Sequence, residues 1–133
     1  MSERRLRQEY LPSYKAAVDA GVEMVMASFN TLNGIPATGN KWLLKNILRE
    51  EWGFNGILIS DYAAINELVA HGFAESQQQA AKLAVEATVD IDMQSSAYVN
   101  ELKSLIENGL LNVEKINDAV WRVLLLKKQI RAF

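Results

Sequence analysis

The sequence predicts an α/β fold in which about three parallel strands alternate with helices. Short apolar runs centred near residues 25, 58 and 91 are separated by segments with the period of amphipathic helices. Buried strands that alternate with helices need crossover connections, which make the strands parallel. The repeat of about 30 residues matches one unit of a (β/α)8 barrel, which takes roughly 250 residues in all. The 133 residues therefore predict a partial TIM (β/α)8 barrel.

The first half of the chain begins with a predicted helix and strand. Leu6 to Ala20 is expected to be helical and to end at Gly21, which readily adopts the left-handed conformation that stops a helix. Val22–Phe29 is a nearly continuous apolar run, typical of a strand covered on both faces. The turn-forming residues 30–39 predict a long loop, and such loops carry the sites of barrel folds.

The alternation continues beyond this loop. Asn40 is expected to cap a helix that runs to about Trp52, and Gly56–Ser60 is the second predicted strand. The remaining predicted elements are, in chain order, helices over 65–69 and 76–87, a third strand over Val89–Met93, and helices over 98–106 and 112–127. A sheet this small leaves unpaired strand edges.

Composition excludes several classes of function. With 14 basic and 16 acidic residues spread along the chain, no patch for nucleic acid is expected. The absence of cysteine removes disulfides and thiol chemistry, and with His71 as the only histidine neither a metal nor another cofactor is expected. No run has the character of a signal peptide or a membrane span, so a soluble chain is expected, in an unknown compartment.

Asp61 is the carboxylate best placed for catalysis. It directly follows the apolar run Gly56–Ser60 and precedes the aromatic Tyr62. In parallel α/β folds, ligands bind at the carboxyl ends of the strands, where this side chain is expected to lie. The same pattern also fits a structural role, because an Asp after a strand often caps the next helix or closes a turn.

Motifs along the whole chain match one enzyme family. The matching runs are, in order, Leu11–Val18, Val25–Asn30, Asn33–Thr38, Trp42–Leu44, Arg49–Gly56, Ile59–Tyr62 and Val89–Met93. In this order and spacing the chain resembles the family-3 glycoside hydrolases, especially the β-glucosidase branch. The resemblance implies that residues 1–133 are a single fragment from the C-terminal part of that family's N-terminal catalytic barrel domain.

The resemblance also implies a function and a site. It implies a retaining β-glycosidase that acts on a β-glucoside or an oligosaccharide, with Asp61 as the nucleophile. Tyr62, Met26 and Phe29 match positions that line the first sugar subsite. Many members have Tyr where this chain has Phe29, and that hydroxyl can hydrogen-bond the nucleophile, which Phe cannot do.

The same resemblance implies that this chain is incomplete as a catalyst. A retaining glycosidase needs two carboxyl groups about 5 Å apart. The family takes its acid from a later domain and other sugar-binding residues from earlier barrel strands, which lie outside this chain. We therefore expect little or no activity from the chain alone. Members of the family can be cytoplasmic, periplasmic or secreted.

Other interpretations remain open. Asp90 and Asp92 border the third strand, and a structural role is expected for both. The tryptophans Trp42, Trp52 and Trp121 are expected to pack between helices and barrel. A non-catalytic fragment could associate with another copy or with a complementary fragment through exposed strand edges. An aldolase or a phosphate-binding isomerase would need a strand-end Lys or a Gly-rich phosphate loop, and neither is visible.

Overall fold

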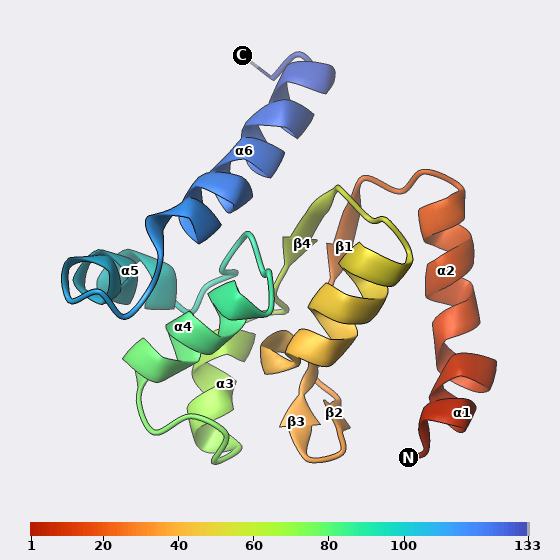
Figure 1. Cartoon of the computed structure of the whole chain (residues 1–133), viewed down its shortest axis with the longest axis horizontal. Helices are drawn as coiled ribbons and strands as arrows, with labels where there is room; N and C mark the ends of the chain where they lie inside the picture. The colour runs from red at the N-terminus through yellow and green to blue at the C-terminus, as the bar shows by residue number, and fades with distance from the viewer. Residues whose placement is uncertain (133) are drawn as a thin grey trace.

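The chain folds around a small parallel sheet. In the computed structural model, which describes residues 1–132, strands β1 (Met24–Met26) and β4 (Ile57–Ile59) lie side by side at the centre (Figure 1). Their register pairs Met24 with Ile57 and Met26 with Ile59. The predicted α/β fold with parallel strands is therefore confirmed, whereas the described residues do not by themselves close a barrel.

Helices make up most of the rest. In chain order they are α1 (Glu3–Arg5), the π-helix η1 (Leu6–Tyr10), α2 (Leu11–Asp19), the short 3-10 helix η2 (Ala37–Gly39), the π-helix η3 (Trp42–Glu51), α3 (Ala64–Ala70), α4 (Gln77–Glu86), α5 (Ala97–Glu107) and α6 (Val113–Gln129). Figure 1 shows η3 in front of the two strands, α3 to α5 on one side and α2 on the other.

The predicted helix ends are confirmed at several positions. The side chains of Asn40 and Asn112 accept hydrogen bonds from Leu43 N at 3.1 Å and Glu114 N at 2.9 Å. These bonds satisfy amide groups that have no partner inside the helix, which is how Asn stabilises a helix start. Gly21 has φ +86°, as expected for a residue that ends a helix.

The strands are shorter than the sequence predicts. The run Val22–Phe29 gives a strand of only three residues, and the third predicted strand, Val89–Met93, is reduced to a single bridge between Ile91 and Ile59. Asp90 N and Ile91 N both donate to Leu58 O, at 2.8 and 3.3 Å, so the backbone does not continue a regular ladder there. Without further strands on either side, a small sheet has little to hold its ends in register.

The prediction that β1 is covered on both faces is wrong for the described chain. Met24 and Met26 are 43% and 44% exposed, while Val25 between them is half-buried. Alternate residues of a strand point to opposite faces. One face of β1 therefore packs on the protein, and the other faces outward.

The predicted loop over residues 30–39 contains a small hairpin. Strands β2 (Thr31–Leu32) and β3 (Ile35–Pro36) pair antiparallel around Asn33 and Gly34, which have φ +53° and +81°. Positive φ at both central residues is the requirement of the turn that Asn-Gly favours. The hairpin signal was present in the sequence, but the flanking strands are only two residues each.

The main core lies between β4 and the helices that follow it. Leu58 on β4 and Ile65 and Leu68 on α3 are completely buried. Helix α4 presents small side chains to its neighbours α3 and α5, and these are Ala80, Ala81 and Ala84, each with no exposed surface. Such small residues allow the three helices to approach closely.

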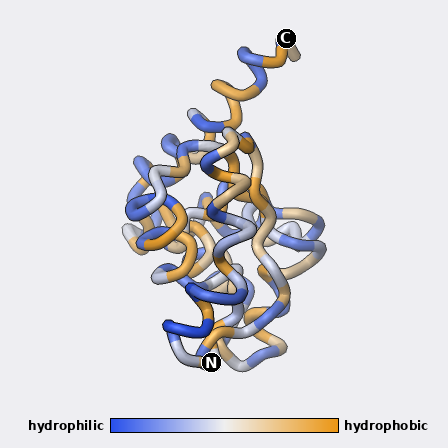
Figure 2. Tube along the Cα trace, turned by 90° about the vertical axis from the view of Figure 1, so that its right-hand side faces the viewer, coloured by the Kyte–Doolittle hydropathy of each residue, from blue (hydrophilic) through white to orange (hydrophobic). Residues whose placement is uncertain are grey.

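Helix α6 differs from the other long helices. It runs from the end of the α5 segment past the start of β4 and projects from the body of the molecule (Figures 1 and 2). All of its residues are described, and none of them is fully buried. Within residues 1–132, no helix is long and apolar enough to span a membrane.

Candidate active site

Asp61 lies at the carboxyl end of β4, as predicted. Its side chain is partly exposed, and its Oδ1 accepts a hydrogen bond from Tyr62 N at 2.7 Å. Helix α3 begins at Ala64, and its start has no side-chain cap within the described chain. The carboxylate is therefore not used to cap this helix, and the described residues leave it open to the solvent.

Ser60 holds the backbone around Asp61 in place. Its hydroxyl is completely buried, accepts from Met93 N at 2.9 Å and donates to Asp61 O at 3.0 Å. Ala63 N donates to Met93 O at 2.8 Å, and Ala63 has a left-handed φ of +56°. The loop after β4 is thus joined at two points to the segment after Ile91, which restricts the position of Asp61.

Sequence reasoning treated Ser60 only as the end of a strand, so its bridging role was missed. We predict that Ser60→Ala lowers the free energy of unfolding by about 1–2 kcal/mol, because Met93 N loses its acceptor in a partly buried position. Urea unfolding measures this change, and amide exchange at Met93 should become faster. The exposed Ser13→Ala serves as the matched control, with an expected change within about 0.5 kcal/mol. Equal stability of both variants would contradict the prediction.

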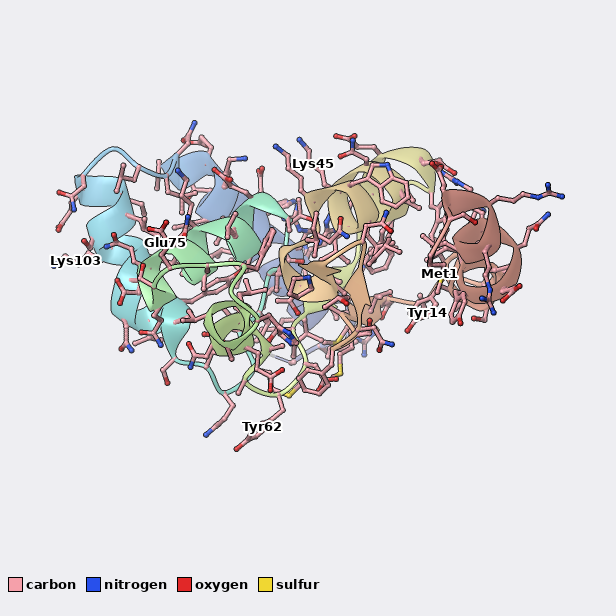
Figure 3. The ribbon with its side chains drawn as sticks, turned by 90° about the horizontal axis from the view of Figure 1, so that it is seen from below. Met1, Tyr14, Lys45, Tyr62, Glu75 and Lys103 are labelled. Carbon is pink, nitrogen blue, oxygen red and sulfur yellow. The ribbon has the colours of Figure 1, made fainter. Side chains whose placement is uncertain are left out.

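The residues expected around the sugar lie at the same end of the sheet. Met26 pairs in register with Ile59, two residues before Asp61, and Phe29 follows β1 on the same side. Met26 and Phe29 are both 44% exposed and Tyr62 is 60% exposed. Figure 3 shows Tyr62 pointing away from the body of the protein. These apolar and aromatic side chains are exposed at the end of the sheet where Asp61 lies.

Asp90 lies at the opposite end of β4 and is a structural residue. Its side chain is completely buried and accepts from Arg49 Nη2 at 2.7 Å, Leu58 N at 2.9 Å, and Arg122 Nε and Nη2 at 2.9 and 2.8 Å. One carboxylate thus joins η3, β4 and α6. Buried carboxylates of this kind need such partners, because an unpaired charge is costly in the interior.

Sequence reasoning also missed the two arginines of this cluster. Burial lowers the pKa of Arg49, and the nearby Asp90 opposes that effect. Arg49 also donates to Gly56 O at 2.9 Å and to Thr88 O at 3.1 Å. Thr88 has φ +73°, an unusual conformation for a β-branched residue, which the arginine helps to hold. Periodicity could not identify these partners, because they are distant in the sequence.

Asp92 has a structural role as well. Its two oxygens accept from Ser95 N and Tyr98 N, each at 3.1 Å, and so organise the turn that leads into α5. The Tyr98 hydroxyl donates to Val89 O at 2.7 Å, and burial, with Asp90 and Asp92 nearby, raises its pKa well above the usual value. The structural interpretation of both aspartates is confirmed. Asp61 thus remains the uncommitted carboxylate at the carboxyl end of β4.

The remaining candidates take no part in this site. His71 directly follows α3, and no cluster of three or more metal-binding side chains occurs within residues 1–132. Trp52 packs against the core, as predicted. Trp42 and Trp121 are 37% and 66% exposed, so the prediction that all three tryptophans are packed is wrong for Trp121.

Comparisons with known proteins match nearly the whole chain to one enzyme family. Residues 1–126 match the model of the glycosyl hydrolase family 3 N-terminal domain. The chain is 44% identical over its full length to a periplasmic β-glucosidase of Salmonella typhimurium and 39% identical to a β-xylosidase of Formosa agariphila. It spans 17% and 20% of those two proteins.

Solved structures show the same relationship. A β-glucosidase of Listeria innocua crystallised with glucose is 48% identical to this chain, with a TM-score of 0.95. The match covers 96% of this chain and 18% of that protein. The match to the family model across nearly the whole sequence shows that this chain belongs to glycosyl hydrolase family 3.

Proposed function

We propose that this chain forms the last part of the catalytic barrel of a retaining β-glycosidase of the β-glucosidase type. The three parallel segments around Val25, Leu58 and Ile91 would be consecutive strands of that barrel. Asp61 would attack the anomeric carbon of a β-glucoside and form a covalent glycosyl-enzyme intermediate. The observation that carries the proposal is the position of Asp61, an uncommitted carboxylate at the carboxyl end of a central strand.

The surroundings of Asp61 suit this chemistry. A nucleophilic carboxylate must be ionised and must have a free oxygen directed at the sugar. Within the described residues, only Tyr62 N donates to it, at 2.7 Å, so the carboxylate keeps acceptor capacity. The exposed Met26, Phe29 and Tyr62 offer apolar and aromatic surface beside it, which suits the faces of a sugar ring.

We propose that the second carboxyl group comes from outside this chain. Asp90 and Asp92 are engaged in structural hydrogen bonds, so neither is available as the acid that protonates the leaving oxygen. The chain spans only 17% of the Salmonella β-glucosidase, which leaves ample length for an acid elsewhere in a complete enzyme. We therefore propose that the chain acts together with the rest of such a barrel and a domain that supplies the acid.

Trapping of the intermediate tests the role of Asp61. The chain is co-expressed with the remaining parts of the Listeria innocua relative and treated with an activated 2-fluoroglucoside, which slows hydrolysis of the intermediate. Mass spectrometry of peptides should find the fluoroglucosyl group on Asp61. Asp61→Asn should prevent labelling, and the exposed Asp118→Asn should leave it unchanged. A label on another residue, or labelling of the Asp61→Asn protein, would contradict the proposal.

A second candidate function follows from the exposed strand β1. Within the described chain, β1 pairs with β4 alone, and Met24 and Met26 are exposed beside it. An apolar groove of about 250 Å³, with Tyr10 and Tyr14 in its wall, runs along this strand. We infer that a non-catalytic fragment would add a strand here, from another copy or from a complementary fragment. Protected edge amides in a compact monomer would count against this candidate.

A further inference from the structure

A network of side-chain amides joins α3, α4 and the segment that leads into α5. Asn66, in the first turn of α3, donates through its Nδ2 to Ser95 O at 2.9 Å. Gln77, the first residue of α4, donates through its Nε2 to Asn66 Oδ1 at 2.9 Å and to Ser95 O at 3.3 Å. We call Asn66, Gln77 and Ser95 the amide network. All of its contacts lie within this chain, so they do not depend on which surfaces the rest of a complete enzyme covers.

The amide network is largely withdrawn from solvent. Ser95 is 3% exposed, and Asn66 and Gln77 are half-buried. A buried polar group costs free energy unless it is hydrogen-bonded, whereas apolar side chains of similar size can pack in such a place without that demand. The bonds add a fixed geometry, because they form only over a narrow range of distance and angle. The network therefore specifies how the start of α3 lies against Ser95.

The segment before Ser95 also holds the loop of Asp61. Met93 N donates to Ser60 Oγ at 2.9 Å, one residue before Asp61. Met93 O accepts from Ala63 N at 2.8 Å, two residues after Asp61. The amide network adds a third attachment in the first turn of α3. The backbone of Asp61 is thus attached to one segment from both sides.

The joined loops contain three left-handed residues other than glycine. Ala63, Gln94 and Ser96 have φ of +56°, +69° and +55°. Such conformations persist where the surrounding contacts hold them, and they cluster at functional sites. Ala63 lies between Asp61 and α3, while Gln94 and Ser96 flank Ser95, whose carbonyl accepts two bonds of the amide network. The network is therefore placed to maintain the shape of both loops.

We propose that Asn66 is a positioning residue for Asp61, an inference that rests on the proposed role of Asp61 as the nucleophile. The Asn66 carboxamide, oriented by Gln77, fixes the start of α3 against Ser95 O. The loop between β4 and α3 is thereby held in the conformation that directs the Asp61 carboxylate at the sugar. Asn66 acts through the backbone and does not itself contact the sugar. A displacement of about 1 Å at a reacting group can lower the rate about a hundredfold.

Labelling by the activated 2-fluoroglucoside measures the rate of attack by Asp61. In the chain co-expressed with the rest of the Listeria innocua relative, Asn66→Ala should lower the labelling rate at saturating reagent about 10- to 100-fold. The reagent concentration that gives half of the maximal rate should change less than about threefold, because sugar binding is retained. Gln77→Ala should give a smaller decrease, since Asn66 keeps its bond to Ser95 O. Asn100→Ala, which removes an exposed amide bonded only to Gln77 Oε1 among the described residues, should label at the parent rate.

Amide exchange in the same co-expressed protein separates positioning from a general loss of stability. Asn66→Ala should accelerate exchange at Ala63 and Met93 more than in β4, because the two loops open locally without global unfolding. Leu105→Ala is the control for stability. Leu105 is 1% exposed and lies more than two turns beyond the start of α5. This variant should accelerate the amides that exchange by global unfolding, and it should label at the parent rate while folded.

Three results would each overturn the proposal. They are unchanged exchange at Ala63 in Asn66→Ala, faster exchange there with an unchanged labelling rate, and an equal loss of labelling in Leu105→Ala. If Asn66→Ala does not fold, Gln77→Ala carries the same test, and an unchanged labelling rate in it would be decisive against the proposal. A wrong assignment of the nucleophile is distinguishable, because it appears in the parent chain as a label on a residue other than Asp61.

Discussion

The isolated chain is expected to hydrolyse aryl β-glucosides at the background rate, and to gain a large activity when the rest of a barrel and an acid-bearing domain are supplied. A positioned general acid contributes roughly 10²–10⁴-fold to such a rate, and loss of a nucleophile commonly costs more. Within residues 1–132, Asp61 is a carboxylate at the carboxyl end of β4 that only Tyr62 N contacts, while Asp90 and Asp92 are engaged in hydrogen bonds to other segments. The assay follows release of a chromogenic leaving group. It compares the hydrolysis rate of the chain alone with the rate of the chain co-expressed with the remainder of the Listeria innocua relative.

The variants that separate the possible outcomes are Asp61→Ala and Asp118→Asn. In the reconstituted protein, Asp61→Ala should remove the gained activity, whereas Asp118→Asn, an exposed substitution on α6, should retain it. A burst of hydrolysis from the purified chain alone, abolished by Asp61→Ala, would refute the expectation of inactivity. It would mean that another carboxyl group of this chain serves as the acid.

Asp90→Asn is expected to lower the free energy of unfolding by about 3–5 kcal/mol, the cost of breaking a buried ion pair by removing one partner. The substitution leaves the Arg49 and Arg122 guanidinium groups without their shared carboxylate in a site where Asp90 has no exposed surface. It also weakens the bond from Leu58 N, which holds the start of β4. Urea unfolding monitored by circular dichroism measures the change.

The control for this variant is again Asp118→Asn, which removes the same charge from an exposed position and should change stability by less than about 0.5 kcal/mol. Arg122→Met should cost less than Asp90→Asn, because Arg49 remains to pair with the carboxylate. If Asp90→Asn and Asp118→Asn unfold at the same urea concentration, the cluster does not stabilise the fold, and another interaction holds α6 in place.

Much of the local structure was predictable from the sequence because its signals are local. Asn40, Asn112 and Gly21 are helix boundary residues whose side chain or backbone acts within one turn. The order of helices and apolar runs followed from periodicity, and so did the position of Asp61 after the second run. The hairpin at Asn33 was overlooked, although Asn-Gly is its usual signal, since its strands are too short to show alternation.

The sequence by itself determined which segments are helical, that the strands run parallel, and that Asp61 stands at a strand end, because hydrophobic period and capping chemistry act between near neighbours. Only the tertiary structure decided the rest. It showed that the Ser60 hydroxyl accepts a hydrogen bond from Met93 N next to the loop of Asp61. It also showed that Asp90 forms ion pairs with both Arg49 and Arg122. These contacts join groups about 30 to 40 residues apart in the chain, and their pairing depends on how the elements pack in space, which no local pattern encodes.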